Sequence, residues 1–532
     1  MRKFCLASVF GIALFACAEQ PEMSNTPTPS STIQTLAGSV SGTVSNWDER
    51  IRVFRGIPYA KPPVGELRFK PPEAIAPWTG VRDATQFSAS CIQAQHTSTF
   101  VWRQEAFSVS EDCLYLNLWS SEDAENLPVM VWFHGGAHTS GQGHSQIFDG
   151  TTLAQNGVVL VTINYRLGPL GFLAHPWLAE ESSHNASGNY GLMDKIAALN
   201  WVRDNIAQFG GNPDNITIFG QSAGSQSVCS LMASPLARGL FHKAIGQSAA
   251  CVGPAPSRDA DGSIRGSKLV DELAVANLAE LRQLDAEQLL VAAERTGWGN
   301  ASRITIDGWV LPEAQVTTFK AGRHAKVPLL IGSLANEGIE LFPVNENLSD
   351  AELDGYLTRM FGEGAGALRA LYESESASPG EIQHAIATDF FMAFGMRRWA
   401  EYSDAAGQPT YLYYMDHVPP AFHLYMPEDP VLELPGGPRS GGAYHSGDLA
   451  FVFGTTDKVG LDWQPADHTL SSAMVSYWTN FAKTGSPNGG NLPPWNVFNR
   501  ESYATQLLNS EPRSTAGVKG DALALMAKAF PL

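Results

Sequence analysis

The motif best suited to chemistry in this sequence is the run of residues 220–224, which reads Gly-Gln-Ser-Ala-Gly and places Ser222 two positions from each glycine. The preceding residues 215–219 are mostly β-branched and apolar, as in a buried strand, and a helix rich in small residues is expected after it. In that setting the motif is a nucleophile elbow, whose sharp turn lifts the serine hydroxyl above the sheet edge. Its glycines let the strand and the helix approach each other, and the helix N-terminus faces the reacting oxygen. The pattern predicts that Ser222 attacks a carbonyl carbon.

A second pattern, at residues 134–137, could stabilise the negative oxygen that such an attack creates. It reads His-Gly-Gly-Ala and directly follows the apolar run 127–133. Loops of this type supply backbone N–H donors to an oxyanion. We expect the donors to be the amides of Gly136, Ala137 and Ala223, and one such donor is typically worth about 2.7 to 4 kcal/mol of barrier lowering.

Histidines near this loop are also potential metal ligands. His134, His138 and His144 are close in the sequence. Their spacing matches no zinc-binding pattern, so we predict neither a metal ion nor another cofactor.

Short apolar runs alternate with helical patterns along the chain, which is typical of βα units. Most of the runs are apolar on both alternations, as expected for strands covered on both faces. We therefore predict an α/β fold with a mostly parallel central sheet, a helix-rich cap at 258–300 and a long surface loop at 426–442. The predicted strands are 127–133, 158–164, 216–219, 243–247, 327–331 and 409–415, and the predicted helices are 192–209, 385–402 and 470–483.

Composition narrows the class of protein and its partners. With 44% hydrophobic and 17% charged residues, the chain resembles globular proteins and not disordered ones. The net charge of −18 repels phosphate groups, so a nucleic-acid partner is excluded. The sequence predicts no oligomeric state.

The N-terminus has the features of an export signal. Arg2 and Lys3 precede the apolar run 4–16, which is too short for a stable membrane span. Residues 14–17 resemble a lipobox in which Cys17 would be lipidated and tether the protein to a membrane, whereas Ala16-Cys17-Ala18 suits ordinary secretion. We predict an export signal at 1–18, a flexible Pro/Ser/Thr-rich tether at 19–35 and one catalytic domain at 36–532. The location is then periplasmic or the outer membrane as a lipoprotein, with secretion as the alternative.

Four cysteines lie beyond the export segment, where disulfides are permitted. Cys229 falls in a predicted helix, which favours a small buried thiol over a disulfide, and the pairing of Cys251 stays open.

Taken together, the motifs resemble the type B carboxylesterase family, which includes bacterial nitrobenzyl esterases, cholinesterases and bile-salt-stimulated lipase. The resemblance implies the α/β-hydrolase fold and hydrolysis of small-molecule carboxylic esters. The matching runs are 54–60, 111–117, 164–168, 188–194 and 220–224.

The resemblance also implies the remaining site residues. Glu337, in a turn after the apolar run 327–331, matches the family's acid, and His445 matches its base. The chain order Ser, Glu, His is that of α/β-hydrolases. Ser248, Asp448 and Gln221 are then expected to surround the triad. The resemblance further implies a Cys91–Cys113 disulfide and the ion pairs Arg68–Glu111 and Arg166–Asp194.

Some residues depart from the family pattern. Gln221 stands where cholinesterases carry a glutamate, which argues against a preference for choline esters. Ala137 replaces a third glycine but keeps its amide. Trp102 is either a wall of the active-site gorge or a core aromatic residue.

Alternative functions remain compatible with the motifs. One is a lipase, or an esterase for a bulky natural product or toxin, with the same fold. Another is a non-catalytic adhesion or binding protein, which the presence of Ser222, Glu337 and His445 disfavours.

Overall fold

The computed structural model describes most of the chain beyond the N-terminus. The predicted export signal and nearly all of the predicted tether lie outside the described residues. No helix among the described residues is both long enough and apolar enough to cross a bilayer. The described residues are 32–94, 100–105, 107–253, 260–300, 303–339, 341–373 and 378–531.

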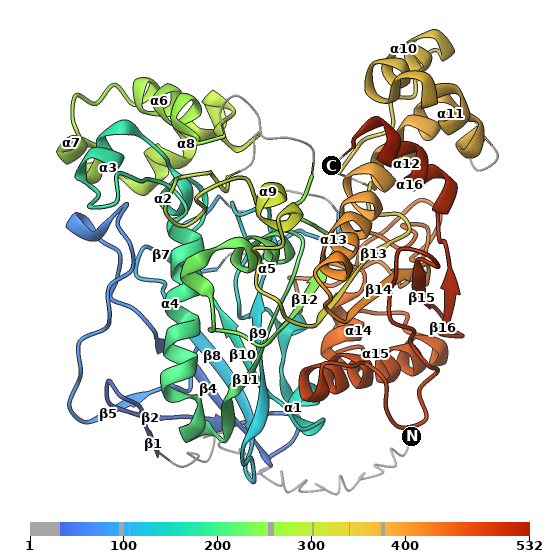
Figure 1. Cartoon of the computed structure of the whole chain (residues 1–532). Helices are drawn as coiled ribbons and strands as arrows, with labels where there is room; N and C mark the ends of the chain where they lie inside the picture. The colour runs from blue at the N-terminus through green and yellow to red at the C-terminus, as the bar shows by residue number, and fades with distance from the viewer. Residues whose placement is uncertain are drawn as a thin grey trace, which may run out of the picture.

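At the centre of the described chain is an 11-stranded twisted sheet (Figure 1). Its order is β16-β15-β14-β13-β12-β11-β9-β10-β8-β4-β3. The strands from β15 to β10 are all parallel, and antiparallel strands close both edges, which confirms the predicted mostly parallel sheet. The strands are β3 (Thr43–Val44), β4 (Ile51–Pro58), β8 (Tyr115–Ser121), β9 (Leu127–Phe133), β10 (Val159–Ile163), β11 (Gly211–Gln221), β12 (Lys243–Gln247), β13 (Leu329–Leu334), β14 (Thr410–Met415), β15 (Ala504–Leu508) and β16 (Arg513–Ala516).

Small sheets lie beside the central one. The first joins β1 (Thr32–Gln34), β2 (Ser39–Ser41) and β5 (Val81–Asp83), and the second joins β6 (Ser90–Cys91) to β7 (Val109–Ser110).

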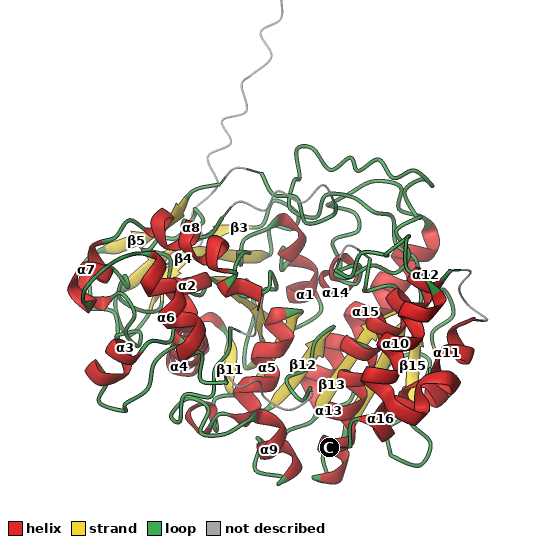
Figure 2. Cartoon of the chain, turned by 90° about the horizontal axis from the view of Figure 1, so that it is seen from above, coloured by secondary structure: helices red, strands yellow, loops and turns green. Residues whose placement is uncertain are grey.

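The inner strands are buried along their whole length because helices cover both faces of the sheet (Figure 2). One buried cluster packs α4 and α5 against the sheet, and a second packs α14 and α15 against the other side. Such two-sided burial explains why these strands read as continuous apolar runs. The helices that cover the sheet are α1 (Thr151–Gln155), α4 (Tyr190–Asn205), α5 (Ala223–Ala233), α13 (Ala393–Ala405), α14 (Leu449–Phe453) and α15 (Pro465–Thr484).

The predicted helix 385–402 is two helices. α12 (Pro379–Phe391) ends before Met392, whose φ of −108° and ψ of −74° interrupt the helical path, and α13 follows. Apolar side chains continue at helical spacing across this break, so periodicity alone did not reveal it.

Two helical groups rise beyond the sheet on opposite sides in Figure 1. The first is the predicted cap, with α6 (Ser263–Glu272), α7 (Leu278–Gln283) and α8 (Ala286–Thr296). The second packs α10 (Asp350–Phe361), α11 (Ala365–Glu373) and α12 against the C-terminal α16 (Gly520–Ala529) around a small apolar cluster. Residues 426–442 form a loop, as predicted. Shorter helices are α2 (Gly168–Phe172), α3 (Pro176–Glu181) and α9 (Gln315–Lys320).

Candidate active site

Ser222 lies in the turn between β11 and α5, as the motif predicts. Its φ of 56° and ψ of −125° are unusual for a residue other than glycine, and its backbone N–H donates to the Gln247 carbonyl at 2.8 Å. The strain is held by close packing, because a Cβ on Gly224 would lie 1.9 Å from the Phe133 carbonyl oxygen. The elbow therefore presents the serine at the start of a helix, at the carboxyl edge of the sheet.

Glu337 and His445 come from two loops at this same edge. Glu337 follows β13 and His445 precedes α14, and the neighbouring residues Asn336 and Tyr444 form a β-bridge. Asn336 also accepts a hydrogen bond from the Ala443 amide at 2.9 Å. These contacts hold the two loops together although the side chains they carry are 108 residues apart.

The imidazole of His445 is held from behind by a buried carboxylate. Its Nδ1 lies 2.5 Å from Oε2 of Glu337, and the other carboxylate oxygen accepts the Leu334 amide at 2.7 Å. His445 is 4% exposed and Glu337 fully buried. A carboxylate so placed fixes the Nδ1–H tautomer and leaves Nε2 as the basic atom of the ring.

Nε2 of His445 faces the elbow. Gln221, immediately before the serine, places its side-chain amide nitrogen 3.1 Å from this atom. Among the described residues, Nε2 has this hydrogen bond and none to the Ser222 hydroxyl. Ser222 and His445 nevertheless line the same cavity, so the hydroxyl and the imidazole face one shared space.

Two of the amides predicted to bind an oxyanion, those of Gly136 and Ala137, lie in the loop 134–138. Gly136, Ala137 and His138 have positive φ angles of 97°, 53° and 58°. The loop is anchored below, because the Tyr165 hydroxyl donates to the His134 carbonyl at 2.8 Å and the Gly168 amide to the His138 carbonyl at 2.7 Å.

The amide groups expected at the oxyanion hole lie on two elements. Gly136 and Ala137 are in the loop, and Ala223 is the first residue of α5, where helix N–H groups have no intrahelical acceptor. Within the described residues, none of these three amides donates to another backbone carbonyl. They are thus free to bind a negative oxygen formed beside Ser222.

A cavity of about 660 Å³ opens over these groups. Its lining combines apolar and aromatic surface with amides and hydroxyls, and none of its described lining residues is Asp, Glu, Lys or Arg. Sequence reasoning missed most of these wall residues, because cavity walls come from separate loops with no shared motif. Besides Ser222, His445, Gln221 and residues 134–137, the lining side chains are Trp102, Gln104, Thr139, Ser140, Gln142, Leu341, Tyr425 and Ser446.

Trp102 is a cavity wall, which settles the alternative left open by the sequence. Its ring lies edge-on to the His445 imidazole, with centroids 6.1 Å apart, and its indole N–H donates to the Ser446 hydroxyl at 3.3 Å. The indole therefore bounds the cavity on the histidine side.

Asp448 and Ser248 lie behind the histidine but do not touch it by a hydrogen bond. Oδ2 of Asp448 accepts the Gln247 side-chain amide at 2.9 Å and the Tyr413 hydroxyl at 3.1 Å. Within the described chain the Ser248 hydroxyl has no hydrogen-bond partner. Burial, together with the nearby negative charge of Glu337, raises the pKa of Asp448 to about 6.

The three histidines of the loop region serve different contacts. His134 stacks on Tyr165, His138 contacts the Gln226 side chain, and His144 contacts the Ser90 hydroxyl. Burial lowers the pKa of His134 to about 3 and that of His144 to about 4. Within the part of the chain that the structure describes, no three His, Cys, Asp or Glu side chains are grouped so as to hold a metal ion.

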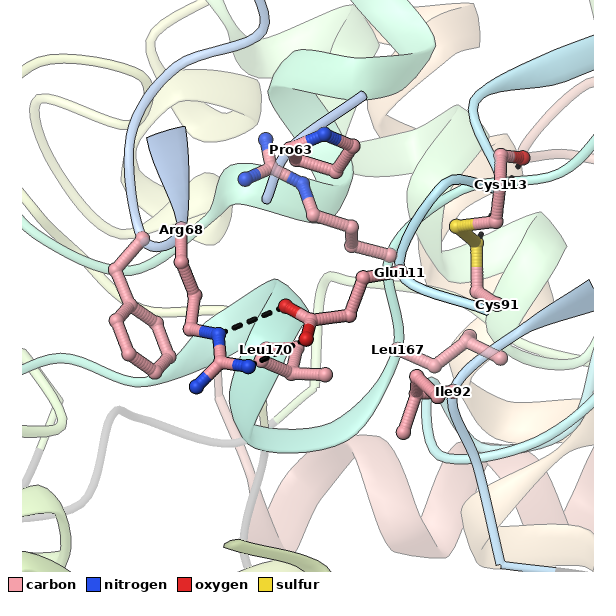
Figure 3. A pocket seen from close by; sticks show the side chains of 10 residues that line it. Pro63, Arg68, Cys91, Ile92, Glu111, Cys113, Leu167 and Leu170 are labelled. Carbon is pink, nitrogen blue, oxygen red and sulfur yellow. Dashed lines mark hydrogen bonds and ion pairs between the residues drawn. A yellow bond between two sulfur atoms is a disulfide. The ribbon is translucent and has the colours of Figure 1, made fainter. Parts of the chain in front are cut away.

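A disulfide and an ion pair brace the loop that carries Trp102. Figure 3 shows the Cys91–Cys113 disulfide beside the Arg68–Glu111 pair, and both match the implied pairings. Arg68 also donates to the carbonyls of Arg282 and Leu284, at 3.0 and 2.6 Å, and so ties the cap to this loop. The small cavity in Figure 3 therefore surrounds a structural ion pair and is separate from the cavity that Ser222 lines.

The implied Arg166–Asp194 pair is also present, with a shortest separation of 2.7 Å and almost no exposure of either side chain.

The interpretation of Cys229 as a free buried thiol is wrong. Cys229 on α5 forms a disulfide with Cys251, which follows β12, and their Cα atoms are 5.6 Å apart. The parallel pairing of β11 with β12 causes this, because α5 leaves the end of one strand and passes the end of the other. A helical pattern shows that Cys229 is buried but not which segment it meets.

Comparisons with known proteins show the family to which the chain belongs. The carboxylesterase family model matches residues 29–525. Human cocaine esterase is 34% identical, with 93% of this chain and 91% of that protein aligned, and the para-nitrobenzyl esterase of Bacillus subtilis is 36% identical, with 90% and 95% aligned. The fumonisin B1 esterase of Sphingopyxis macrogoltabida is 34% identical, with 90% and 87% aligned.

Solved structures of similar shape include a PNB esterase with a TM-score of 0.80 and 33% identity, in which 93% of this chain and 99% of that chain are covered. The chain therefore belongs to the carboxylesterase family, has the α/β-hydrolase fold and is a serine hydrolase that cleaves carboxylic esters.

Proposed function

We propose that Ser222 is the nucleophile of this esterase, His445 its general base and Glu337 the acid that orients the histidine. The contact that carries the proposal is the 2.5 Å approach of Glu337 Oε2 to His445 Nδ1, with Nε2 turned toward the cavity that Ser222 lines. His445 takes the serine proton as the hydroxyl attacks the ester carbonyl, and Glu337 stabilises the imidazolium that forms.

The proposed oxyanion hole consists of the amides of Gly136, Ala137 and Ala223. They stabilise the tetrahedral oxygen, and His445 then gives its proton to the departing alcohol. Water attacks the acyl-serine in the same way, with His445 again as base, and releases the acid. The bond between the acyl carbon and the alcohol oxygen is thus replaced first by a bond to the Ser222 oxygen and then by a bond to the oxygen of water.

The substrate we propose is a small, uncharged ester with hydrogen-bonding groups. Apolar and aromatic groups, among them Leu341 and Trp102, line the cavity together with amides and hydroxyls, and none of its described walls is Asp, Glu, Lys or Arg. A negative net charge of −18 also repels anionic substrates. The relatives named for cocaine, fumonisin B1 and para-nitrobenzyl esters are about equally similar to this chain, so overall identity does not choose among their substrates.

A matched ester panel tests both proposals. Choline acetate is compared with its uncharged isostere 3,3-dimethylbutyl acetate, and p-nitrophenyl hydrogen glutarate with its methyl ester. We expect kcat/KM to be at least about tenfold higher for the neutral member of each pair, because an unpaired charge must be desolvated in this cavity. Equal or better turnover of the charged esters would contradict the substrate proposal.

The same panel includes p-nitrophenyl esters of increasing acyl length and the Ser222→Ala variant. We expect short and medium chains to be preferred, since the side chains of Trp102, Leu341 and Tyr425 bound the cavity. A preference for emulsified long-chain esters would favour the lipase alternative. Ser222→Ala should lose about 10⁵-fold or more in kcat. Full activity in that variant, or no labelling of Ser222 by a fluorophosphonate, would disprove the nucleophile.

We propose that the protein works outside the cytoplasm as one catalytic domain, residues 36–532, held on a tether. The two disulfides support an oxidising location. Lipidation of Cys17 is the version we favour, with release as a secreted protein the alternative. Metabolic labelling with palmitate distinguishes them: label that is lost in Cys17→Ser supports the lipoprotein, and an unlabelled mature chain supports secretion.

A further inference from the structure

The hydrogen bond between Gln221 and His445 has a consequence for the base. In the proposed mechanism, the lone pair on Nε2 must accept the Ser222 proton. In the structure that lone pair faces the Gln221 amide at 3.1 Å. Gln221 is 2% exposed, so its side chain is enclosed at this position.

The chemistry of the two partners fixes who donates. Nδ1 of His445 carries the proton that goes to Glu337, so Nε2 of the neutral ring can only accept. A glutamine meets this requirement with its NH₂ group, whereas an ionised glutamate has acceptors only. The Gln221 contact therefore matches the neutral imidazole, and a carboxylate at the same place would match the imidazolium.

The surroundings hold the Gln221 side chain in this orientation. Its backbone is the last paired position of β11, in register with Gln247 of β12. Its side-chain oxygen lies against the oxyanion loop, because a Cβ on Gly135 would come within 2.9 Å of it. The amide is thus placed between the oxyanion loop and the base, with its nitrogen toward the ring.

We propose that Gln221 is a positioning residue that keeps His445 in its neutral, acceptor form between turnovers and yields Nε2 to the Ser222 hydroxyl when an ester binds. The inference rests on the proposed roles of Ser222 and His445. Gln221 would then help to set the pH above which the enzyme is active. The amide opposes protonation of His445, so activity extends to lower pH than it would with a carboxylate at position 221.

Other titratable groups also lie around the ring. Glu337 faces it from the loop after β13, and Asp448 acts on it from its own segment before α14. Tyr413 on β14 contacts Asp448 and does not reach the ring by a hydrogen bond. With two carboxylates already behind the imidazole, a third at position 221 would stabilise the imidazolium still more.

The test measures kcat/KM against pH for Gln221→Glu, Gln221→Met and the wild type. We expect Gln221→Glu to move the midpoint of the acid limb upward by about one pH unit or more, since an opposite charge at this range shifts a titration by 1–3 units. At the alkaline plateau its kcat should recover to within about tenfold of the wild type. Gln221→Met removes the donor without adding charge, so it should lower kcat/KM about three- to tenfold with a smaller upward shift of the midpoint.

A matched control places the same charge change elsewhere on the molecule. Gln208 is exposed, just before β11, at the opposite end of this strand from the elbow. Gln208→Glu should leave both kcat/KM and its pH midpoint unchanged.

An unmoved midpoint in Gln221→Glu overturns the proposal, because a residue that only fills space would change the rate without its pH dependence. Should Gln221→Glu not fold, Gln221→Met decides: wild-type kcat/KM and midpoint would overturn the role. Loss of the Gln221 inference leaves the esterase mechanism intact, whereas an active Ser222→Ala would remove the mechanism itself.

Discussion

The two sides of the His445 ring are built from different chemistry. Toward the cavity lie the Gln221 amide, the Ser222 hydroxyl and backbone N–H groups, none of which carries a charge. Behind the ring lie Glu337 and Asp448, both fully buried. In the proposed mechanism this difference is a division of labour: neutral donors on the cavity side bind developing negative charge, and the carboxylates behind the ring stabilise positive charge on His445.

The two buried carboxylates of the back are themselves unequal. Each oxygen of Glu337 has a partner, one in His445 and one in the Leu334 amide. Asp448 concentrates its contacts on Oδ2, and Oδ1 has no hydrogen-bond partner in the described chain. Glu337 and Asp448 are equally buried but differ in their contacts, so we expect substitutions of the two residues to have different effects on activity.

Of the two carboxylates behind the ring, Glu337 should give the larger effect when it is replaced, in Glu337→Gln. An amide cannot stabilise the imidazolium as a carboxylate does, and it can favour the wrong tautomer, so we expect kcat to fall by about 10³- to 10⁴-fold. Asp448→Asn should cost less than about tenfold, because Asp448 acts on the ring only through space. Both are measured on one neutral ester at the alkaline plateau, with circular dichroism as the check on folding. Equal losses in the two variants would break the proposed distinction between the two acids.

The next effect concerns stability and pH at Asp448. Its pKa is raised to about 6 from an ordinary value of 3.8, so the folded protein holds this proton more tightly than the unfolded chain. The stabilisation is then present at low pH and is lost as pH rises from about 4 to 6. A pKa difference of this size corresponds to roughly 3 kcal/mol.

Asp448→Asn removes this titration. The difference in unfolding free energy between the variant and the wild type should therefore shift in favour of the variant as pH rises from 4 to 7. Denaturant unfolding at both pH values measures it, with the two proteins always compared at the same pH. A difference independent of pH would show that Asp448 is ionised in the folded protein at both pH values.

The sequence predicted the bounds of several strands well, but it did not predict which distant residues lie next to each other in the fold. The bounds of the strands 127–133 and 243–247 agree with β9 and β12, because each is a short apolar run between clear turns. The disulfide of Cys229 depends on how two strands lie side by side, and no local pattern contains that.

The site shows the same limit at finer detail. The elbow and the oxyanion loop could be recognised locally, whereas Glu337 and His445 were assigned only through the family resemblance. The hydrogen bond from Gln221 to His445 joins residues 224 apart, so only the fold reveals that the amide and not the serine faces Nε2. Likewise, the walls made by Gln104, Gln142 and Tyr425 come from separate loops.

The smallest effect should come from the proposed oxyanion donors on the cavity side, because these are main-chain amides and not side chains. Ala137 has a φ of 53°, which costs an alanine about 1 kcal/mol and a glycine almost nothing. Ala137→Gly should therefore raise stability by less than about 1 kcal/mol, after the greater freedom of glycine in the unfolded chain is counted, and leave kcat within about threefold. Thermal unfolding measures the change in stability, and kinetics at the alkaline plateau measure kcat.

Ala223→Gly is the matched control, because Ala223 begins α5 with an ordinary helical backbone and glycine there should lower stability slightly. Opposite signs of the stability change at the two alanines, with both enzymes active, would sharpen the contrast between a front that works through main-chain amides and a back that works through carboxylates. A loss of kcat in Ala137→Gly as large as that in Glu337→Gln would instead mean that the methyl group at position 137 holds the oxyanion amides in place.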